Sequence, residues 1–215
     1  MNEKERIARR VALELGDGDV VNLGIGLPTL VASFVPDDIH ITLQSENGIL
    51  GMGGIAGEGD VVHDTVNAGG TPVTVNTGAC FFDSATSFVI IRGGHVNLTV
   101  LGALQVDEKG NIASHIIPGK MVPGMGGAMD LVTGSRRVVV AMQHTAKGGA
   151  HKIMRNITLP ATAVGKVHMI VTELAVMDVT DEGLVLREVA EGVSVEEVQA
   201  ATEAKLIVSH NLKTF

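Results

Sequence analysis

The sequence contains no tryptophan and no tyrosine, has only five phenylalanines, and carries fewer basic than acidic residues. Sixteen Lys and Arg against 24 Asp and Glu give a formal net charge of −8, so no net positive field attracts phosphate backbones. Aromatic side chains on which nucleic-acid bases stack are nearly absent as well. The composition therefore argues against a nucleic acid as partner.

Cysteine is equally scarce, because Cys80 is the single one. One cysteine excludes an intramolecular disulfide and a multi-cysteine metal site, and it fits a reducing compartment. We expect Cys80 to be a small buried hydrophobic residue without a catalytic role. The eight histidines show no recognised metal spacing, so the sequence predicts no metal site.

Long apolar runs are also missing, since none approaches the ~18 residues that span a bilayer, and the first residues lack the apolar stretch of a signal peptide. We expect a cytoplasmic protein with no membrane partner. Glycine, in contrast, is abundant at 27 of 215 residues, which predicts tight turns and close backbone approaches. At ~100–200 residues per domain, the length predicts one domain over residues 1–215.

The order of apolar patterns predicts alternating helices and strands. Helical spacing covers residues 3–15, 28–36 and 127–132, and a capping box at 194–197 precedes a helix to 204. Short runs rich in β-branched residues predict buried strands at 20–23, 39–43, 72–75, 88–91, 98–101, 137–142 and 169–171. This alternation favours an α/β fold with a mainly parallel sheet flanked by helices, whose reactive groups lie at the carboxyl ends of the strands.

A glycine loop follows the strand at 20–23. Gly24 and Gly26 stand two residues apart, but the third glycine of a dinucleotide-binding fingerprint is missing. The loop is either an ordinary tight turn or a loop whose amides face an anion or oxyanion. Asn22 lies just before it and either caps the strand end or points its amide into the same crevice.

A carboxylate occupies the turn after the next strand, where Ser-Glu-Asn-Gly spans residues 45–48. Rigid backbone on both sides would hold Glu46 at a sheet edge, where a nucleophile is useful, and Gly48 allows a sharp turn. Surface glutamates are common, however, and the pattern alone leaves open that Glu46 is a solvated turn residue.

Six blocks of sequence together resemble the β subunit of family I CoA-transferases, which act on 3-oxoacids such as acetoacetate. The blocks cover 22–29, 44–48, 66–69, 91–95, 101–106 and 118–130 and extend over nearly the whole chain. The resemblance implies the CoA-transferase (NagB/RpiA-like) fold. Its members most similar in these blocks are of the acetate or butyrate:acetoacetate type, with the succinyl-CoA:3-oxoacid type as the alternative.

The resemblance also implies the roles of individual residues. Glu46 would be the nucleophile, forming first an acyl-glutamyl anhydride and then a glutamyl-CoA thioester, while the Asn22 side chain and the amide around Gly127 would donate to the oxyanions. Coenzyme A thioester would be a substrate, and no permanently bound cofactor is expected. The residues expected to contact CoA are Gly24, Gly26, Asn47, Gly48 and Gly126.

The family divides its work between two chains, and the Gly-Gly-Phe motif of the α chain is absent here. We therefore expect a separate α subunit in a heterodimer or heterotetramer, with acyl-CoA and short-chain carboxylic acids as ligands. Ser114 and His115 replace a common Asn-Trp, and Gly70 stands where some members have lysine. A catalytically silent subunit is a weaker alternative, because the chain retains Glu46. A sugar-phosphate isomerase is weaker still, because it needs a cationic phosphate site.

Methionine is common, at nine residues, and we expect most of them to fill the core. Three fall in the glycine-rich segment around residue 125 and are expected to line an acyl pocket: Met121, Met125 and Met129.

Overall fold

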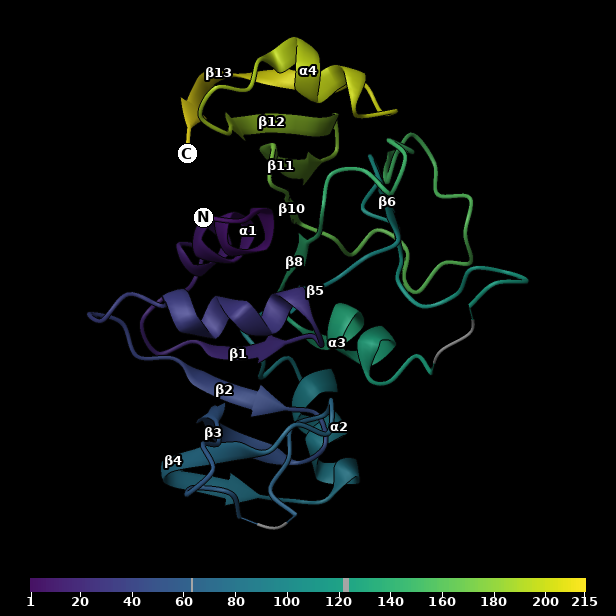
Figure 1. Ribbon diagram of the computed structural model, residues 1–215. Coiled ribbons are helices and arrows are strands. Elements are labelled where there is room, and N and C mark those ends of the chain that lie inside the picture. Colours follow the sequence, from purple (N-terminus) through teal and green to yellow (C-terminus); the bar gives the residue numbers. More distant parts are fainter. Residues whose placement is uncertain (63, 122–123) are drawn as a thin grey trace.

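The computed structural model describes residues 1–62, 64–121 and 124–215 and builds them around one large sheet with helices on both faces (Figure 1). The strand order in this sheet is β13-β12-β11-β10-β8-β5-β1-β2-β3-β4. Five central strands are parallel to one another. They are β1 (Val20–Leu23), β2 (Thr42–Ser45), β5 (Leu98–Leu101), β8 (Arg137–Ala141) and β10 (Met169–Val171).

Parallel pairing places the carboxyl ends of these five strands at one edge of the sheet, which we name the carboxyl edge. The register sets Asn22 of β1 between Gln44 of β2 and Thr99 of β5. The predicted α/β fold with a parallel sheet is confirmed for this central part. Both flanks add antiparallel pairs, which the sequence pattern did not predict.

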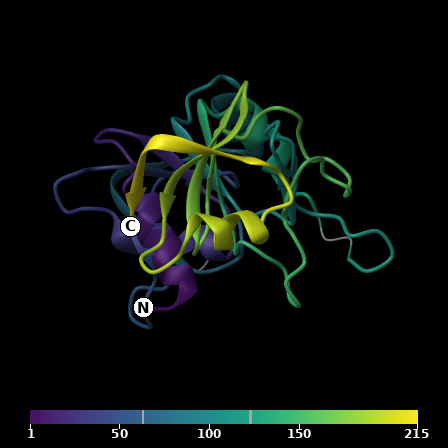
Figure 2. The ribbon, with the colours of Figure 1, turned by 90° about the horizontal axis from the view of Figure 1, so that it is seen from above.

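The flanking strands complete the architecture. On one side β2 is followed by β3 (Ile49–Ile55) and β4 (Val73–Phe81), and on the other β10 is followed by β11 (Ala175–Thr180), β12 (Gly183–Val189) and β13 (Leu206–Thr214). A separate three-stranded sheet contains β6 (Gln105–Asp107), β7 (Ile112–Ala113) and β9 (Ile153–Met154). Figures 1 and 2 both show the loops around this small sheet extending outward from the main sheet.

Helices cover the two faces of the main sheet. Helix α1 (Glu3–Ala12) and the 3₁₀ helix η1 (Leu27–Phe34) pack on one face, and α2 (Ser84–Arg92), α3 (Ala128–Gly134) and α4 (Val195–Ala200) pack on the other. Successive residues of a strand point to opposite faces, so Val138 and Val140 join the core under α3 whereas Val139 and Ala141 join the core under α1. None of the helices in the described ranges is long and apolar enough to cross a membrane.

The strand predicted at 88–91 is wrong, because these residues lie in α2. Asp83 caps this helix by accepting a 2.8 Å hydrogen bond from the Thr86 amide, and Gly93 ends it. A run of four apolar residues fits a buried helix as well as a strand, and the capping residues on either side decide the matter.

The other element predictions differ mainly in their ends. The helix predicted for 3–15 ends at Ala12, and that predicted for 28–36 is the 3₁₀ helix η1. The strand predicted for 39–43 begins at Thr42 and continues to Ser45, and β4 continues six residues past Val75. The capping box at Ser194 is confirmed, but its helix, α4, ends at Ala200 rather than at residue 204.

Cys80 is exposed on strand β4, so the prediction of a buried cysteine is wrong.

The glycine-rich segment 48–59 does not consist only of turns, because β3 passes through it. Its Gly51 has a φ of +87°, and a Cβ there would lie 3.0 Å from Ala79 on β4. Glycine therefore allows β3 and β4 to approach at a bulge, which a propensity argument does not capture.

A buried ion-pair network joins α1 to distant strands. Arg10 donates two hydrogen bonds of 2.7 and 2.8 Å to Glu188 on β12 and one of 2.7 Å to Glu14. Arg137 of β8 also donates to Glu14. Burial alone would raise the pKa of Glu14, but the hydrogen bonds from Arg10 and Arg137 lower it below its ordinary value. The network thus fixes α1 against both β8 and β12.

His144 follows β8 and is fully buried between two threonines. Its Nδ1 lies 2.8 Å from Thr172 Oγ1, and its Nε2 lies 2.8 Å from Thr202 Oγ1. Burial, together with the nearby charges of His151 and Lys152, lowers the pKa of His144 from 6.5 to about 4. The imidazole is therefore neutral in the folded protein at neutral pH.

This environment predicts a loss of stability in acid. As the pH falls from 6.5 to about 4, His144 is protonated in the unfolded chain but stays neutral in the folded protein. The free energy of unfolding therefore falls by about 3 kcal/mol over this pH range. Urea unfolding at pH 7 and pH 4 measures this loss. In His144→Gln the loss should be smaller by about 3 kcal/mol, whereas His40→Gln, at a side chain that is 92% exposed, should leave it unchanged. An equal acid dependence in wild type and His144→Gln would contradict the assignment.

Candidate active site

A cavity of about 680 Å³ opens at the carboxyl edge, where β1, β2 and β5 end. This volume lies within the range of ligand pockets, ~300–1,000 Å³. We name it the Glu46 cavity. It brings together parts of the chain that are far apart in sequence, and its lining includes Asn22, Gly24, Gly26, Gln44, Glu46, Ile55, Asn67, Leu104, Ser114, His115, Met125, Gly126 and Gly127.

Glu46 occupies the turn between β2 and β3 and is partly buried. The Gly48 amide closes the turn by donating a 3.0 Å hydrogen bond to the Ser45 carbonyl oxygen, and the Gly48 carbonyl oxygen accepts one of 3.0 Å from the Phe82 amide. Gly48 has a φ of +116°, and a Cβ at this position would overlap the Phe82 carbonyl oxygen. Only glycine fits here, so backbone from β2 and from the end of β4 holds Glu46 in place.

The neighbours of Glu46 fasten the same turn to the loop before β4. Ser45 Oγ accepts a 3.1 Å hydrogen bond from the Ala68 amide, and Asn47 Nδ2 donates one of 2.7 Å to the Val66 carbonyl oxygen. Asn47 and Gly48 do not belong to the cavity lining. They position the carboxylate from behind, and their contact with CoA stays a prediction.

The carboxylate of Glu46 meets a backbone amide from another part of the chain. Gly127, which caps the start of α3, donates a 2.9 Å hydrogen bond to Glu46 Oε1. A Cβ at Gly126 would lie 3.2 Å from Oε1, and a Cβ at Gly127 would overlap the carboxylate itself. Glycine at 127 therefore allows its N–H group to reach the carboxylate in this position, because a Cβ there would displace it.

Asn22 lies in the wall of the same cavity and is buried. Its Nδ2 donates to two oxygens of Gln44, the carbonyl oxygen at 3.1 Å and Oε1 at 2.7 Å. Gln44 Nε2 in turn donates a 3.0 Å hydrogen bond to Ser87 Oγ on α2. An amide nitrogen has two protons, so Asn22 must release Gln44 before it can donate to a substrate oxygen.

Sequence reasoning did not single out Gln44, which lies within β2. The only signal for it was its place directly before Ser45 and Glu46. Gly24 and Gly26 line the cavity, but the Gly24 amide donates a 2.8 Å hydrogen bond to the Val100 carbonyl oxygen. The role of Gly24 is thus a close approach between β1 and β5, because a Cβ would lie 3.0 Å from that oxygen.

Of the three methionines expected around an acyl pocket, Met125 lines the cavity, whereas Met121 and Met129 are outside its lining. Ser114 and His115, the pair that departs from the family pattern, are both in the lining. The cavity wall in the described residues contains no Lys or Arg. Its charged group is therefore the Glu46 carboxylate.

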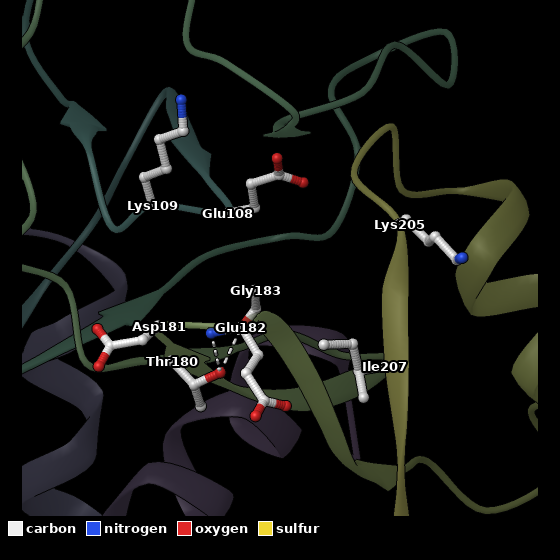
Figure 3. Close-up of a pocket in the computed structure, with 8 residues that line it drawn as sticks. All are labelled: Glu108, Lys109, Thr180, Asp181, Glu182, Gly183, Lys205 and Ile207. Atoms are coloured by element: carbon white, nitrogen blue, oxygen red, sulfur yellow. Dashed lines mark hydrogen bonds between the residues drawn. The ribbon is translucent and has the colours of Figure 1, made fainter.

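A second hollow of about 520 Å³ lies between the β11–β12 turn, the end of β6 and β13 (Figure 3). It is lined by Glu108, Lys109, Thr180, Asp181, Glu182, Gly183, Lys205 and Ile207. Figure 3 shows their charged ends directed apart, and the hydrogen bonds drawn there only close the β11–β12 turn around Thr180. Among the described residues no group of three or more His, Cys, Asp or Glu side chains is arranged to hold a metal ion. This hollow brings no nucleophile and donor together.

Several named proteins are similar to this chain in sequence. The beta subunit of the acetate CoA-transferase of Escherichia coli K12 is 59% identical over 215 residues, which cover all of this chain and 98% of the relative. One subunit of the succinyl-CoA:3-ketoacid coenzyme A transferase of Helicobacter pylori 26695 is 48% identical over 205 residues, 95% of this chain and 99% of that protein.

Solved structures show the same fold. An acyl-CoA transferase (YdiF) from Escherichia coli O157:H7 superposes with a TM-score of 0.79 at 24% identity, and this chain spans 43% of its length. Glutaconate coenzyme A-transferase from Acidaminococcus fermentans gives 0.73 at 19% identity, covering all of this chain and 89% of the other. A decarboxylase, AibA/AibB, also gives 0.71 at 19% identity over 98% of this chain and 87% of the other, so the fold alone does not fix the chemistry.

Sequence similarity is therefore the stronger indicator of family. The family described as Coenzyme A transferase matches residues 4–201, nearly the whole chain. Taken with the high identity to its named members and the shared fold, this match shows that the chain belongs to the coenzyme A transferase family.

Proposed function

We propose that the chain is the catalytic β subunit of a CoA-transferase that moves CoA between a short-chain acyl-CoA or 3-oxoacyl-CoA and a carboxylic acid, with Glu46 as nucleophile. The observation that carries the proposal is the 2.9 Å hydrogen bond between the Gly127 amide and Glu46 Oε1 inside the cavity. A carboxylate and an oxyanion donor are thereby placed together. The relatives named as beta subunits of acetate CoA-transferases support the same conclusion.

The exchange needs no external energy source, because the thioester bond is first exchanged for an anhydride and then restored. A Glu46 oxygen attacks the thioester carbonyl carbon and the C–S bond breaks. This step forms an acyl-glutamyl anhydride and releases CoA as a thiolate. The thiolate then attacks the Glu46 carbonyl carbon, forming a Glu46–CoA thioester and releasing the first acid as its carboxylate. A second carboxylic acid then reacts through the same two steps in reverse order and leaves as the new acyl-CoA. Coenzyme A is thus a substrate, and the proposal requires no bound cofactor.

The Gly127 amide fits the step at the Glu46 carbonyl carbon. When the thiolate attacks there, negative charge develops on the Glu46 oxygen, and an N–H group already 2.9 Å from that oxygen can stabilise it. Removing one such donor in other enzymes costs ~2.7–4 kcal/mol. Asn22 is the proposed donor for the other oxyanion, on the acyl group, once its amide leaves Gln44.

The cavity wall favours a monocarboxylic acid. A dicarboxylic acid such as succinate leaves a second carboxylate that requires a cationic partner when buried, and the described wall offers no Lys or Arg. We therefore propose the acetate, acetoacetate and butyrate class as acids of this chain and rank the succinyl-CoA type second. The retained Glu46 and its donor argue against a silent subunit.

We also propose that an α subunit completes the site. The anhydride and thioester intermediates hydrolyse unless water is excluded. Yet Ile25 and Ile55, two apolar residues of the cavity lining, are 70% and 76% exposed. A partner covering them would both bury apolar surface and close the cavity. Relatives that are named as single subunits of CoA-transferases agree with a division into two chains.

One prediction concerns the covalent intermediate. The complex of this chain with its α subunit, incubated with acetoacetyl-CoA, should show a CoA adduct on Glu46 by intact mass. Borohydride or hydroxylamine should then release the CoA and leave an alcohol or a hydroxamate at Glu46. Glu46→Ala should show none. Glu46→Asp should lose most activity, because its shorter arm displaces the attacking oxygen by about 1 Å. Failure of the assembled wild-type complex to form an adduct with acetoacetyl-, acetyl-, butyryl- or succinyl-CoA would refute the proposal.

Another prediction concerns the donor. Gly127→Ala adds a Cβ that overlaps the Glu46 carboxylate, so the side chain and the amide must separate. We expect about a 100-fold slower formation of the adduct, the loss typical of a ~1 Å displacement. Gly59→Ala is the matched control, since a Cβ there meets no atom within 4 Å and the residue lies outside the cavity lining. Equal rates in the two variants would exclude a role for the Gly127 contact.

A further inference from the structure

One wall of the Glu46 cavity carries an imidazole that the proposed mechanism does not use. His115 follows β7, lines this cavity and is 9% exposed. Leu104 lies near it in the wall, because the Leu104 amide donates a 2.8 Å hydrogen bond to the Ala113 carbonyl oxygen. Leu104 and Met125 contribute apolar lining. The His115 ring is thus a polar group in a wall that faces the reacting ligands.

Thr162 anchors the segment from behind. Its Oγ1 accepts a 3.0 Å hydrogen bond from the Ser114 amide and lies 2.8 Å from Ser114 Oγ and 3.1 Å from His115 Nδ1. The Thr162 amide itself donates a 2.7 Å hydrogen bond to the Ile112 carbonyl oxygen, which fixes its backbone to β7. Thr162 is buried. The ring of His115 is thus held by a rigid partner on one side.

A count of donors and acceptors shows what this arrangement leaves unpaired. A threonine hydroxyl has one proton and two lone pairs, and the three contacts of Thr162 Oγ1 use all of them. His115 Nδ1 is therefore occupied. His115 Nε2, on the opposite side of the ring, has no hydrogen-bond partner among the residues that the structure describes. Once a ligand displaces water from the cavity, an unpaired Nε2 is unfavourable, so a ligand group that pairs with it is favoured.

We propose that His115 Nε2 forms a hydrogen bond to a polar oxygen on the acyl chain of the substrate, such as a 3-oxo group, and thereby selects oxo or hydroxy acids over plain alkyl acids. This inference rests on the proposed function, because it assumes that an acyl group binds beside Glu46. Thr162 is the positioning residue, which acts by orienting the ring. Either tautomer of His115 serves, since Nε2 donates to a carbonyl or accepts from a hydroxyl.

A pair of acids with equal carbon number tests the proposal. Acetoacetate and butyrate are compared as acceptors with the same donor, acetyl-CoA, in the complex with the α subunit, and the ratio of their kcat/KM values is measured. His115→Asn keeps an amide near Nδ1 for Thr162 and removes Nε2, so the acetoacetate:butyrate ratio should fall about three- to tenfold. His115→Gln places its amide near Nε2 and should keep the ratio within about twofold of wild type.

Thr162 provides a second, independent variant. Thr162→Val releases the ring and should lower the same ratio, whereas Thr162→Ser keeps the hydroxyl and should restore it. A loss of fold would change the rates for both acids together, so the ratio separates specificity from stability. Formation of the Glu46–CoA adduct from acetyl-CoA in each variant confirms that the site is assembled.

The outcomes separate the two proposals. An unchanged acetoacetate:butyrate ratio in a His115→Asn variant that still forms the Glu46–CoA adduct would overturn the role of His115. Absence of the Glu46–CoA adduct in the wild-type complex would instead overturn the proposed function. A ratio that falls in His115→Asn and recovers in His115→Gln establishes the proposal.

Discussion

The site depends on a steric constraint, the absence of a Cβ on the residue that donates to Glu46. The Gly127 amide reaches the carboxylate at 2.9 Å, where a Cβ on Gly127 would overlap that carboxylate. The constraint is matched on the other side of the carboxylate, where Gly48 allows the turn to close against the Phe82 backbone. Glycines thus hold Glu46, the proposed nucleophile, between two segments of backbone, which do not reorganise as a flexible side-chain donor would.

Much of this arrangement could be predicted from local sequence. The strands at 20–23, 98–101 and 169–171 have the predicted bounds, because short runs rich in β-branched residues indicate buried parallel strands. The carboxylate at Glu46 and the glycine at 127 were also found, but their pairing came from resemblance to a family. A contact between residues 81 positions apart leaves no periodic signal in a single sequence.

The features that the sequence did not predict also have physical causes. Residues 88–91 are a helix because capping at Asp83 outweighs β-branched propensity, and β3 passes through glycines because bulges relieve its close approach to β4. The engagement of Asn22 by Gln44 depends on the register of β1 and β2, which places the two side chains next to each other. Register is a property of the paired strands, so neither strand reveals it alone.

The ion pair between α1 and β12 has a consequence for synthesis on the ribosome. Arg10 is made early, but its partner Glu188 follows 178 residues later, and Arg137 reaches Glu14 only after 123 residues. Until then the charged face of α1 lacks these two partners, and the helix cannot dock on the sheet in its final form. The final contacts of α1 can therefore form only after most of the chain has been synthesised.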